Sequence, residues 1–359
     1  MCFRSFILFN SDVYYIQNNV ECAHSTFVTR KIGCFMSALE LCAYGGVENL
    51  VFNDSTEVPS PKKDEVQVKI LAAGVNVIDT KIRLGTSFAA KTRGERFPWV
   101  IGFDMSGEVV KVPKDCEDFQ KGDKVCGLVG FPLNGGAYSS LNNFQASELI
   151  KIPEGCGIKV AGALPLAGLT AYQALFDIGH LQPEQTVIIS AAAGGVGHLA
   201  VQLAKNAGAR VLGICSKENH QFVKDLGADG VAEYDHEECL KWQSEADLFI
   251  DLVGGQSAIN NLSLLKLNAT MVSVPTVTYQ AVRLAATDMS INVAGMVVKQ
   301  NKAQLKKMLD MIADGDLKVH ISESFFLKDG AKAHAVIGGG HTIGKLILLP
   351  NGIVREVKV

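Results

Sequence analysis

A glycine-rich turn between an apolar run and an amphipathic run constrains this chain more than any other feature. Residues 187–189 are wholly apolar, and residues 190–197 are almost all small. Gly194 lets the backbone approach a pyrophosphate, and Gly197 lets the next helix pack close to the strand. Free N–H groups at such a helix start attract an anion. The segment predicts a strand, a phosphate-binding turn and a helix, with Ala192 in the first glycine position of the pattern.

The residues after this turn alternate between short apolar runs and amphipathic runs. Expected strands are 186–190, 210–215, 248–253 and 270–274, and expected helices are 195–206, 219–226 and 257–265. Short apolar strands separated by helices form parallel units with covered faces and right-handed crossovers. We therefore expect an α/β fold with a doubly wound parallel sheet, a Rossmann dinucleotide-binding domain, over residues 161–297.

The first half of the chain has a different pattern. Val66, Val68 and Ile70 alternate with polar residues, which indicates a half-buried strand. Further short strands and glycine-containing turns follow, so residues 36–160 are expected to form an antiparallel, barrel-like β domain. Helices at 303–313 and 329–337 and a strand at 344–349 are expected within the C-terminal segment, residues 298–359.

Composition limits the classes of partner. A length of 359 residues suffices for two domains, and a net charge of -3 gives no field that attracts nucleic acid, so the expected partner is a small molecule. The most apolar stretches, 160–176 and 187–204, are interrupted by polar and glycine residues, and no transmembrane segment is expected. The nine cysteines are scattered and odd in number, which predicts reduced thiols and a cytoplasmic location.

The first 35 residues are expected to be an extension outside the core. Two interpretations stay open for them. Arg4, Lys31 and several Ser and Thr residues are compatible with an organelle transit peptide, although Asp12 weakens it. An upstream extension with Met36 as the working start is the interpretation we favour.

The end of the second expected strand bears on the choice of dinucleotide. NAD sites usually place Asp or Glu there to accept from the ribose 2′-hydroxyl. This chain instead has Ser216 and Lys217, followed by His220, with Tyr234 beyond the third strand. A hydroxyl and an ammonium bind a 2′-phosphate, so the pattern predicts NADPH. The alternative is that Lys217 and His220 lie on a solvated helix start.

Taken in order, eight segments make the chain resemble the zinc-free quinone oxidoreductase family of the medium-chain dehydrogenases/reductases. It is similar in particular to chloroplast-envelope quinone oxidoreductase homologues. The matching segments are 76–81 (NVIDTK), 102–107 (GFDMSG), 122–125 (GDKV), 135–138 (GGAY), 164–171 (LPLAGLTA), 194–197 (GGVG), 226–229 (LGAD) and 340–345 (GHTIGK). The resemblance implies a GroES-like substrate domain, a Rossmann NADPH domain and a C-terminal return to the substrate domain. It also implies NADPH-driven reduction of quinones or of the C=C bond of α,β-unsaturated carbonyl compounds.

The resemblance also implies a set of cofactor contacts. These are Lys81, Thr170, Gly194, Gly195, Val196, Gly197, Ser216, Lys217, His220, Tyr234, Val253, Val274, Pro275 and Lys345. The zinc members of the superfamily carry Cys where this chain has Asn76, and Gly-His-Glu where it has Gly102-Phe103-Asp104. Without a cysteine cluster no metal is expected.

Reduction without a metal requires a partner for the charge that develops on the acceptor oxygen. The candidates are Asn76, Lys81 and Tyr138, while Asp79 is expected to cap the short helix that contains Lys81. Some relatives carry Tyr near Phe88, so here the final proton is expected from solvent. His198 is expected to be a satisfied histidine without a catalytic role.

Two other functions stay open at this point: a reductase of enoyl thioesters, and a non-catalytic NADPH-binding protein of the same fold. Dimers are common in the family that the chain resembles, so a homodimer is one expected assembly.

Overall fold

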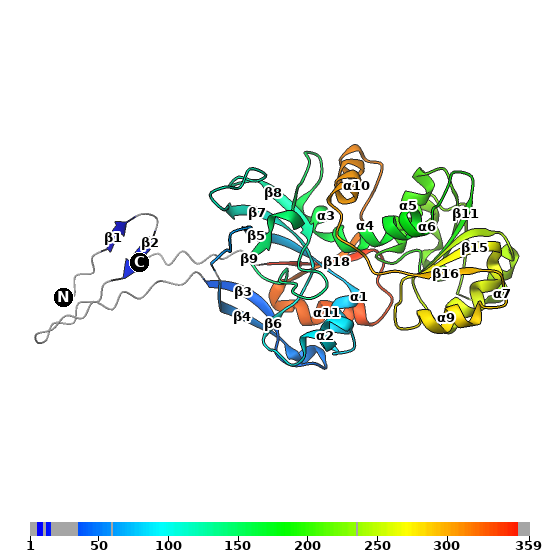
Figure 1. Cartoon of the computed structure of the whole chain (residues 1–359), viewed down its shortest axis with the longest axis horizontal. Coiled ribbons are helices and arrows are strands. Elements are labelled where there is room, and N and C mark those ends of the chain that lie inside the picture. Colours follow the sequence, from blue (N-terminus) through cyan, green and yellow to red (C-terminus); the bar gives the residue numbers. More distant parts are fainter. Residues whose placement is uncertain (1–5, 10–11, 16–34, 59, 235, 351–359) are drawn as a thin grey trace, which may run out of the picture.

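The computed structural model describes residues 6–9, 12–15, 35–58, 60–234 and 236–350. Residues from 35 onward form a β domain and an α/β domain side by side (Figure 1). Most of the first 35 residues fall outside this described part. Within it, β1 (Phe6–Phe9) and β2 (Asp12–Tyr15) pair with each other. The expectation of an N-terminal extension therefore stays a prediction.

The β domain contains a seven-stranded sheet in the order β10-β8-β7-β5-β18-β17, with β9 also paired to β5, and a three-stranded sheet in the order β4-β3-β6. The strands are β3 (Phe35–Leu41), β4 (Leu50–Glu57), β5 (Glu65–Val75), β6 (Trp99–Val100), β7 (Asp104–Lys111), β8 (Lys124–Leu128), β9 (Leu141–Gln145), β10 (Ile150–Lys151), β17 (Ile321–Phe326) and β18 (Lys345–Leu349). Val66, Val68 and Ile70 on β5 are buried, as their alternation predicts. This is the expected GroES-like architecture.

Short helices fill the ends of the β domain. They are η1 (Val47–Asn49), α1 (Val77–Arg83), α2 (Phe88–Arg93), η2 (Ala146–Glu148), α3 (Ile158–Ala163), η7 (Leu327–Asp329) and α11 (Gly330–Gly338). Asn76, not Asp79, is the N-cap of α1. Asp79 lies three residues further on and accepts a hydrogen bond from the backbone N–H of Asn76 at 2.9 Å. Asp79 therefore helps to cap α1 as expected, but from the third helical position of a capping box and not as the N-cap residue.

The α/β domain is built on a six-stranded sheet in the order β13-β12-β11-β14-β15-β16, in which every pairing is parallel. Its strands are β11 (Thr186–Ser190), β12 (Arg210–Ile214), β13 (Gly230–Ala232), β14 (Ala246–Asp251), β15 (Leu265–Ser273) and β16 (Asn292–Gly295). Every residue of β11 is buried. Because the chain runs from β11 to β12 and β13 on one side and to β14 on the other, the strand order reverses beside β11, where doubly wound sheets bind their ligands.

Helices cover both faces of this sheet, with α5 and α6 on one face and α9 on the other (Figure 1). The helices of the domain and of its connections are α4 (Pro165–Tyr172), η3 (Gln173–Ile178), α5 (Gly197–Asn206), η4 (Lys217–Asn219), α6 (His220–Asp225), α7 (His236–Cys239), η5 (Leu240–Trp242), α8 (Gly255–Asn260), η6 (Asn261–Leu264), α9 (Tyr279–Ala285) and α10 (Lys302–Asp314). Among the described residues, no helix combines the length and the apolar character that a membrane span requires.

The chain returns from the α/β domain through α10 and then pairs β18 with β5. At the start of β18, Gly344 donates its backbone N–H to Ala193 in the glycine-rich turn at 2.8 Å. Gly344 has a φ of 59°, and a Cβ atom there would lie 2.3 Å from the carbonyl oxygen of His320. A glycine is therefore required where the return strand meets the turn.

We expect Gly344→Ala to destabilise the protein more than Gly340→Ala. Gly340 has a φ of 77°, but a Cβ atom on it would meet no other atom within 4 Å. Both alanine variants therefore bear the cost of a left-handed backbone conformation, about 1–2 kcal/mol, and Gly340→Ala bears no further steric cost. The clash with His320 should cost Gly344→Ala a further ~1–3 kcal/mol. Urea unfolding of both variants measures the difference, and equal losses would contradict the steric argument.

Candidate active site

The residues predicted to contact the cofactor gather at one edge of the parallel sheet. Gly194 follows β11, Ser216 follows β12, Tyr234 follows β13, Val253 follows β14 and Val274 follows β15. Since the carboxyl ends of parallel strands meet at the same edge, residues up to eighty positions apart in sequence lie along one edge of the sheet. Pro275 adjoins Val274, and Gly195, Val196 and Gly197 continue the turn after β11.

The turn after β11 has the shape of a phosphate cradle. A Cβ atom on Gly197 would lie 2.2 Å from the carbonyl oxygen of Ala191, so the helix and strand approach as closely as the sequence predicts. The helix itself begins at Gly197, two residues later than expected. Nothing larger than glycine fits against the strand at Gly197, and the N–H groups at such a helix start attract an anion. These residues fit the pyrophosphate of a dinucleotide.

A buried histidine holds this turn from behind. His198 is fully buried, and burial lowers its pKa to about 4, so its ring is neutral at pH 7. Nε2 accepts from the backbone N–H of His320 at 3.2 Å, which leaves Nδ1 to donate to the carbonyl oxygen of Gly194 at 2.9 Å. Both ring nitrogens are thus used within the fold, in agreement with the expectation of a satisfied histidine.

The ends of the central strands are fixed by two side chains that the sequence analysis missed. Asp251, buried at the end of β14, accepts from the backbone N–H of Val253 at 3.1 Å and from the Ser273 hydroxyl at 2.7 Å. Ser190 accepts from the backbone N–H of Leu252 at 2.8 Å. An acid at the last position of a buried strand was the signal available in the sequence.

The group predicted to bind a 2′-phosphate lies at the end of β12. Ser216 is the N-cap of η4, and Asn219 donates to its hydroxyl at 2.9 Å. Lys217 is exposed and Tyr234 is 50% exposed. Within the described residues, the buried Nε2 of His220 has no hydrogen-bond partner. A buried nitrogen without a partner calls for a ligand or water, and a phosphate oxygen fits it.

Glu218 is an acid in this group that the sequence analysis did not weigh. Hydrogen bonds from its own backbone N–H and from Ser216 lower the pKa of Glu218. A carboxylate here repels a phosphate and accepts from a ribose hydroxyl, so Glu218 opposes the contribution of Lys217.

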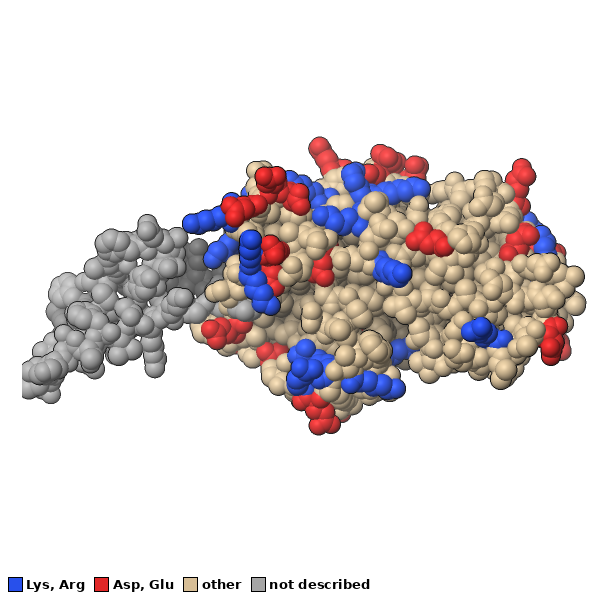
Figure 2. Space-filling model, viewed as in Figure 1, with Lys and Arg blue, Asp and Glu red and all other residues tan. Residues whose placement is uncertain are grey.

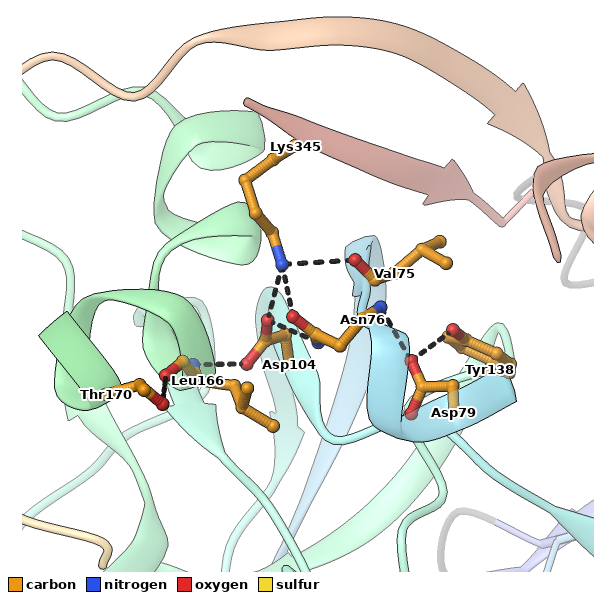
Figure 3. A network of polar contacts seen from close by, with 8 residues as sticks. All are labelled: Val75, Asn76, Asp79, Asp104, Tyr138, Leu166, Thr170 and Lys345. Carbon is orange, nitrogen blue, oxygen red and sulfur yellow. Dashed lines mark hydrogen bonds and ion pairs between the residues drawn. The ribbon is translucent and has the colours of Figure 1, made fainter. Parts of the chain in front are cut away.

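A second part of the site is a buried polar network between the two domains (Figure 3). Lys345, at the start of β18, donates from Nζ to the side-chain oxygen of Asn76, to the carbonyl oxygen of Val75 at 3.1 Å and to Asp104 Oδ2 at 3.5 Å. Asn76 Nδ2 donates to the same Asp104 oxygen at 2.9 Å, and Leu166 donates its backbone N–H to Asp104 Oδ1 at 2.6 Å.

The hydrogen bonds define the charge of this network. Three acceptors surround the nitrogen of Lys345, which matches the three hydrogens of an ammonium, and every partner of Asp104 is a donor, which matches a carboxylate. Burial raises the pKa of Asp104 and lowers that of Lys345, and the attraction between them opposes both shifts. Asp104 was missed as a site residue, although it lies in a segment that carries the resemblance.

The contacts of Lys345 within the fold bear on the cofactor contact expected of it. Its residue is 2% exposed, and its ammonium points into the β domain with all three hydrogens used. The contact with the cofactor turn is made by the aliphatic stem, because a Cβ atom on Gly195 would lie 3.3 Å from Lys345 Cδ. The stem of Lys345 therefore supports the turn while its ammonium bonds within the β domain, and its contact with a cofactor stays a prediction.

The hydroxyl of Tyr138, another predicted site residue, is also engaged within the fold. Tyr138 is fully buried, its hydroxyl donates to Asp79 Oδ2 at 2.7 Å, and its ring packs edge-on against His334 at 5.8 Å. Burial raises the pKa of Asp79 to about 7, and within the described residues its Oδ1 has no partner. The hydroxyl of Tyr138 is thus bonded to Asp79 on α1.

Of the other candidates, Thr170 uses its hydroxyl within its own helix, whereas the ammonium of Lys81 has no partner among the described residues. Thr170 is buried on α4 and its hydroxyl donates to Leu166 in the same helix at 2.7 Å. Lys81 lies half-buried on α1, and in the part of the chain that the structure describes its ammonium makes no hydrogen bond or ion pair. Asn76 retains one amide hydrogen. Asn76 and Lys81 therefore stay the candidates for contact with an acceptor.

The donor set at Asn76 does not suit a metal. The matching positions hold an amide, the buried Phe103 and Asp104, and the ammonium of Lys345 already occupies the space between them. No group of three or more His, Cys, Asp or Glu side chains in the described ranges has metal-binding geometry.

We expect Asp79→Asn to change how stability depends on pH. Between pH 3.8 and about 7 the folded protein keeps a proton on Asp79 that the unfolded chain releases, so this residue lowers stability as the pH rises through that window. Across this window, the free energy of unfolding of the variant should rise relative to that of the wild type by on the order of 1.4 kcal/mol per pH unit. Chemical denaturation at pH 5 and pH 7 measures the gain, and parallel curves would contradict the raised pKa.

Comparison with family models gives two matches. Residues 62–154 match the model described as alcohol dehydrogenase GroES-like domain, and residues 226–348 match the model described as zinc-binding dehydrogenase.

Curated relatives and solved structures extend these matches over most of the chain. The chloroplast envelope quinone oxidoreductase homolog of Arabidopsis thaliana is 31% identical, covering 89% of this chain and 99% of that protein. A 2-methylene-furan-3-one reductase of Solanum lycopersicum is 30% identical, with 91% and 82% covered. The quinone oxidoreductase structure from Coxiella burnetii is 36% identical with a TM-score of 0.84, covering 88% and 99%. The Escherichia coli quinone oxidoreductase complexed with NADPH is 27% identical with a TM-score of 0.77, covering 88% and 100%.

Proposed function

The chain belongs to the zinc-free quinone oxidoreductase family of the medium-chain dehydrogenases/reductases, and from this premise we propose that it uses NADPH to reduce quinones or the C=C bond of α,β-unsaturated carbonyl compounds. A relative from Mus musculus is named an NAD(P)H oxidoreductase, and the Escherichia coli quinone oxidoreductase structure is complexed with NADPH. The observation that carries the proposal is the joining of two parts: a phosphate cradle at the sheet edge, and the amide of Asn76 held beside it through Lys345.

The residues divide the chemistry between them. A bound nicotinamide supplies the hydride. The turn from Gly194 to Gly197 binds the pyrophosphate through backbone N–H groups. The remaining amide hydrogen of Asn76 and the ammonium of Lys81 stabilise the negative charge that develops on the acceptor oxygen. Because the Tyr138 hydroxyl is committed to Asp79, the final proton comes from solvent.

The substrate class is supported by the names of two relatives. The 2-methylene-furan-3-one reductase of tomato is named for a C=C bond conjugated to a carbonyl group, and quinones contain the same conjugated unit. Hydride addition to such a unit places negative charge on an oxygen, which is the charge that Asn76 and Lys81 are suited to stabilise.

The acceptor panel that tests this function contains a benzoquinone, a naphthoquinone, an alkenal and an enoyl thioester, with NADPH oxidation followed by absorbance. We expect turnover with the quinones or the alkenal. Turnover with the thioester alone would favour an enoyl-thioester reductase. Tight NADPH binding without turnover of any acceptor would favour a non-catalytic NADPH-binding protein.

For the cofactor we propose NADPH, on the basis of Ser216, Lys217 and the partnerless His220 Nε2. Replacing Ser216 and Lys217 by Asp and Ala should lower the preference for NADPH over NADH by about tenfold or more, since one charge-assisted contact contributes ~1.5–3 kcal/mol. Glu218→Gln is the matched variant, and it should raise the preference because it removes the opposing carboxylate. The ratio of kcat/KM for the two cofactors measures both effects, and an unchanged ratio in the double variant would refute this phosphate site.

We further propose a homodimer in the cytoplasm. β16 is the last strand of its sheet, and an unpaired edge is a surface on which a second chain can add a strand. Leu284 on the adjoining α9 is 76% exposed.

Positive and negative side chains are interspersed over the face in Figure 2, which suits a small-molecule enzyme better than a nucleic-acid-binding protein.

A further inference from the structure

Asn76 is held on three sides by buried groups. Its backbone N–H donates to Asp79, its amide nitrogen donates to Asp104, and its amide oxygen accepts from Lys345 (Figure 3). All four residues are at most 5% exposed. One amide hydrogen of Asn76 is left without a partner among the described residues, so this side chain has a single donor to offer.

The charges around Asn76 decide which way its amide faces. With an ammonium at the oxygen and a carboxylate at the nitrogen, each end of the amide meets its complement. The flipped amide would place N–H groups against Lys345 and an oxygen against Asp104, which is unfavourable on both sides. The ion pair of Lys345 and Asp104 therefore locks the direction of the remaining N–H.

The same lysine also connects Asn76 to the cofactor turn. The stem of Lys345 packs on Gly195, and Gly344 beside it bonds to Ala193. The amide direction is thus set by a strand, β18, whose start packs against the turn proposed to bind the pyrophosphate. An ammonium at the amide oxygen also strengthens the remaining N–H as a donor, since charge-assisted hydrogen bonds polarise their neighbours.

We propose that Lys345 is a positioning residue for hydride transfer, which together with Asp104 holds the Asn76 amide so that its remaining N–H donates to the acceptor oxygen. This rests on the proposed conjugate reduction. It assigns Asn76 as the catalytic donor and gives Lys345 a role that acts through Asn76, in place of a contact with the cofactor.

A double-mutant cycle of Lys345→Met and Asn76→Ser tests whether one residue acts through the other. Serine keeps an N-cap side chain at the start of α1 but is too short to replace the amide. With the acceptor that the wild type reduces, single-turnover hydride transfer should fall about tenfold to 100-fold in Lys345→Met, while the NADPH dissociation constant changes by less than ~3-fold. The double variant should be no slower than Asn76→Ser alone.

Three further variants separate positioning from folding. Lys345→Arg keeps the cation and should recover most of the rate. Lys345→Met combined with Asp104→Asn removes both charges, so it avoids a lone buried carboxylate and should fold while remaining slow. Lys332→Met removes an exposed lysine of α11 and should leave the rate unchanged. Full additivity in the cycle, or a large loss of NADPH affinity with an unchanged rate, would overturn the proposal.

A measurement without turnover keeps the proposal separate from the proposed function. In protein labelled with ¹⁵N-asparagine, the side-chain NH₂ signal of Asn76, assigned by its loss in Asn76→Ser, should be protected from hydrogen exchange in the wild type. Lys345→Met should accelerate that exchange about tenfold or more, because the amide is no longer held. Equal exchange in both proteins would refute the lock even if the enzyme reduces enones, and accelerated exchange would support it even if no acceptor is found.

Discussion

The buried ammonium of Lys345 ties the C-terminal return strand to the rest of the β domain, directly beside the glycine-rich turn of the α/β domain. Removing an ion from water costs several kcal/mol unless its partners are well placed. Here the partners come from the end of β5, the start of α1 and the start of β7, while the lysine arrives with β18 from the other end of the chain. The α/β domain lies between these segments in the sequence, so the ion pair joins two parts of the β domain that come before and after it in the chain.

Around this pair the site has two kinds of construction. The cofactor side consists of backbone at strand ends, held by side chains such as His198 and Asp251 whose hydrogen bonds are fully used within the fold. The proposed acceptor side consists of the side chains of Asn76 and Lys81 at one short helix. A rigid cradle suits a cofactor that every reaction shares, whereas side chains on a short helix suit an acceptor whose shape differs between relatives.

Local patterns in the sequence predicted much of the fold. The strand before the glycine turn has the predicted bounds, and the alternation at Val66, Val68 and Ile70 gives a buried face. Residues after consecutive parallel strands meet at one edge whatever the details of packing, so the cofactor positions were predictable from strand order. These features depend on neighbours in sequence or on the general geometry of sheets.

The roles of Lys345 and Tyr138 were not predictable in this way. Lys345 and Asn76 are 269 residues apart, and only the pairing of β18 with β5 brings them together. The direction of a side chain depends on packing that no local pattern records, so Lys345 was expected to face the cofactor and Tyr138 the acceptor. The position usually checked for an acid is the end of the second strand. Glu218 lies beyond it, in a 3-10 turn that places its carboxylate against the hydroxyl of Ser216.

Isotope transfer tests the central claim, conjugate reduction by a nicotinamide without a metal, most directly. NADPH carrying deuterium at both C4 positions of the nicotinamide is incubated with the protein and an alkenal, and the product is analysed by mass spectrometry and NMR. The account predicts a saturated aldehyde with one deuterium on the carbon β to the carbonyl group. Deuterium on the carbonyl carbon of an alcohol product, or product formed without deuterium, would contradict it.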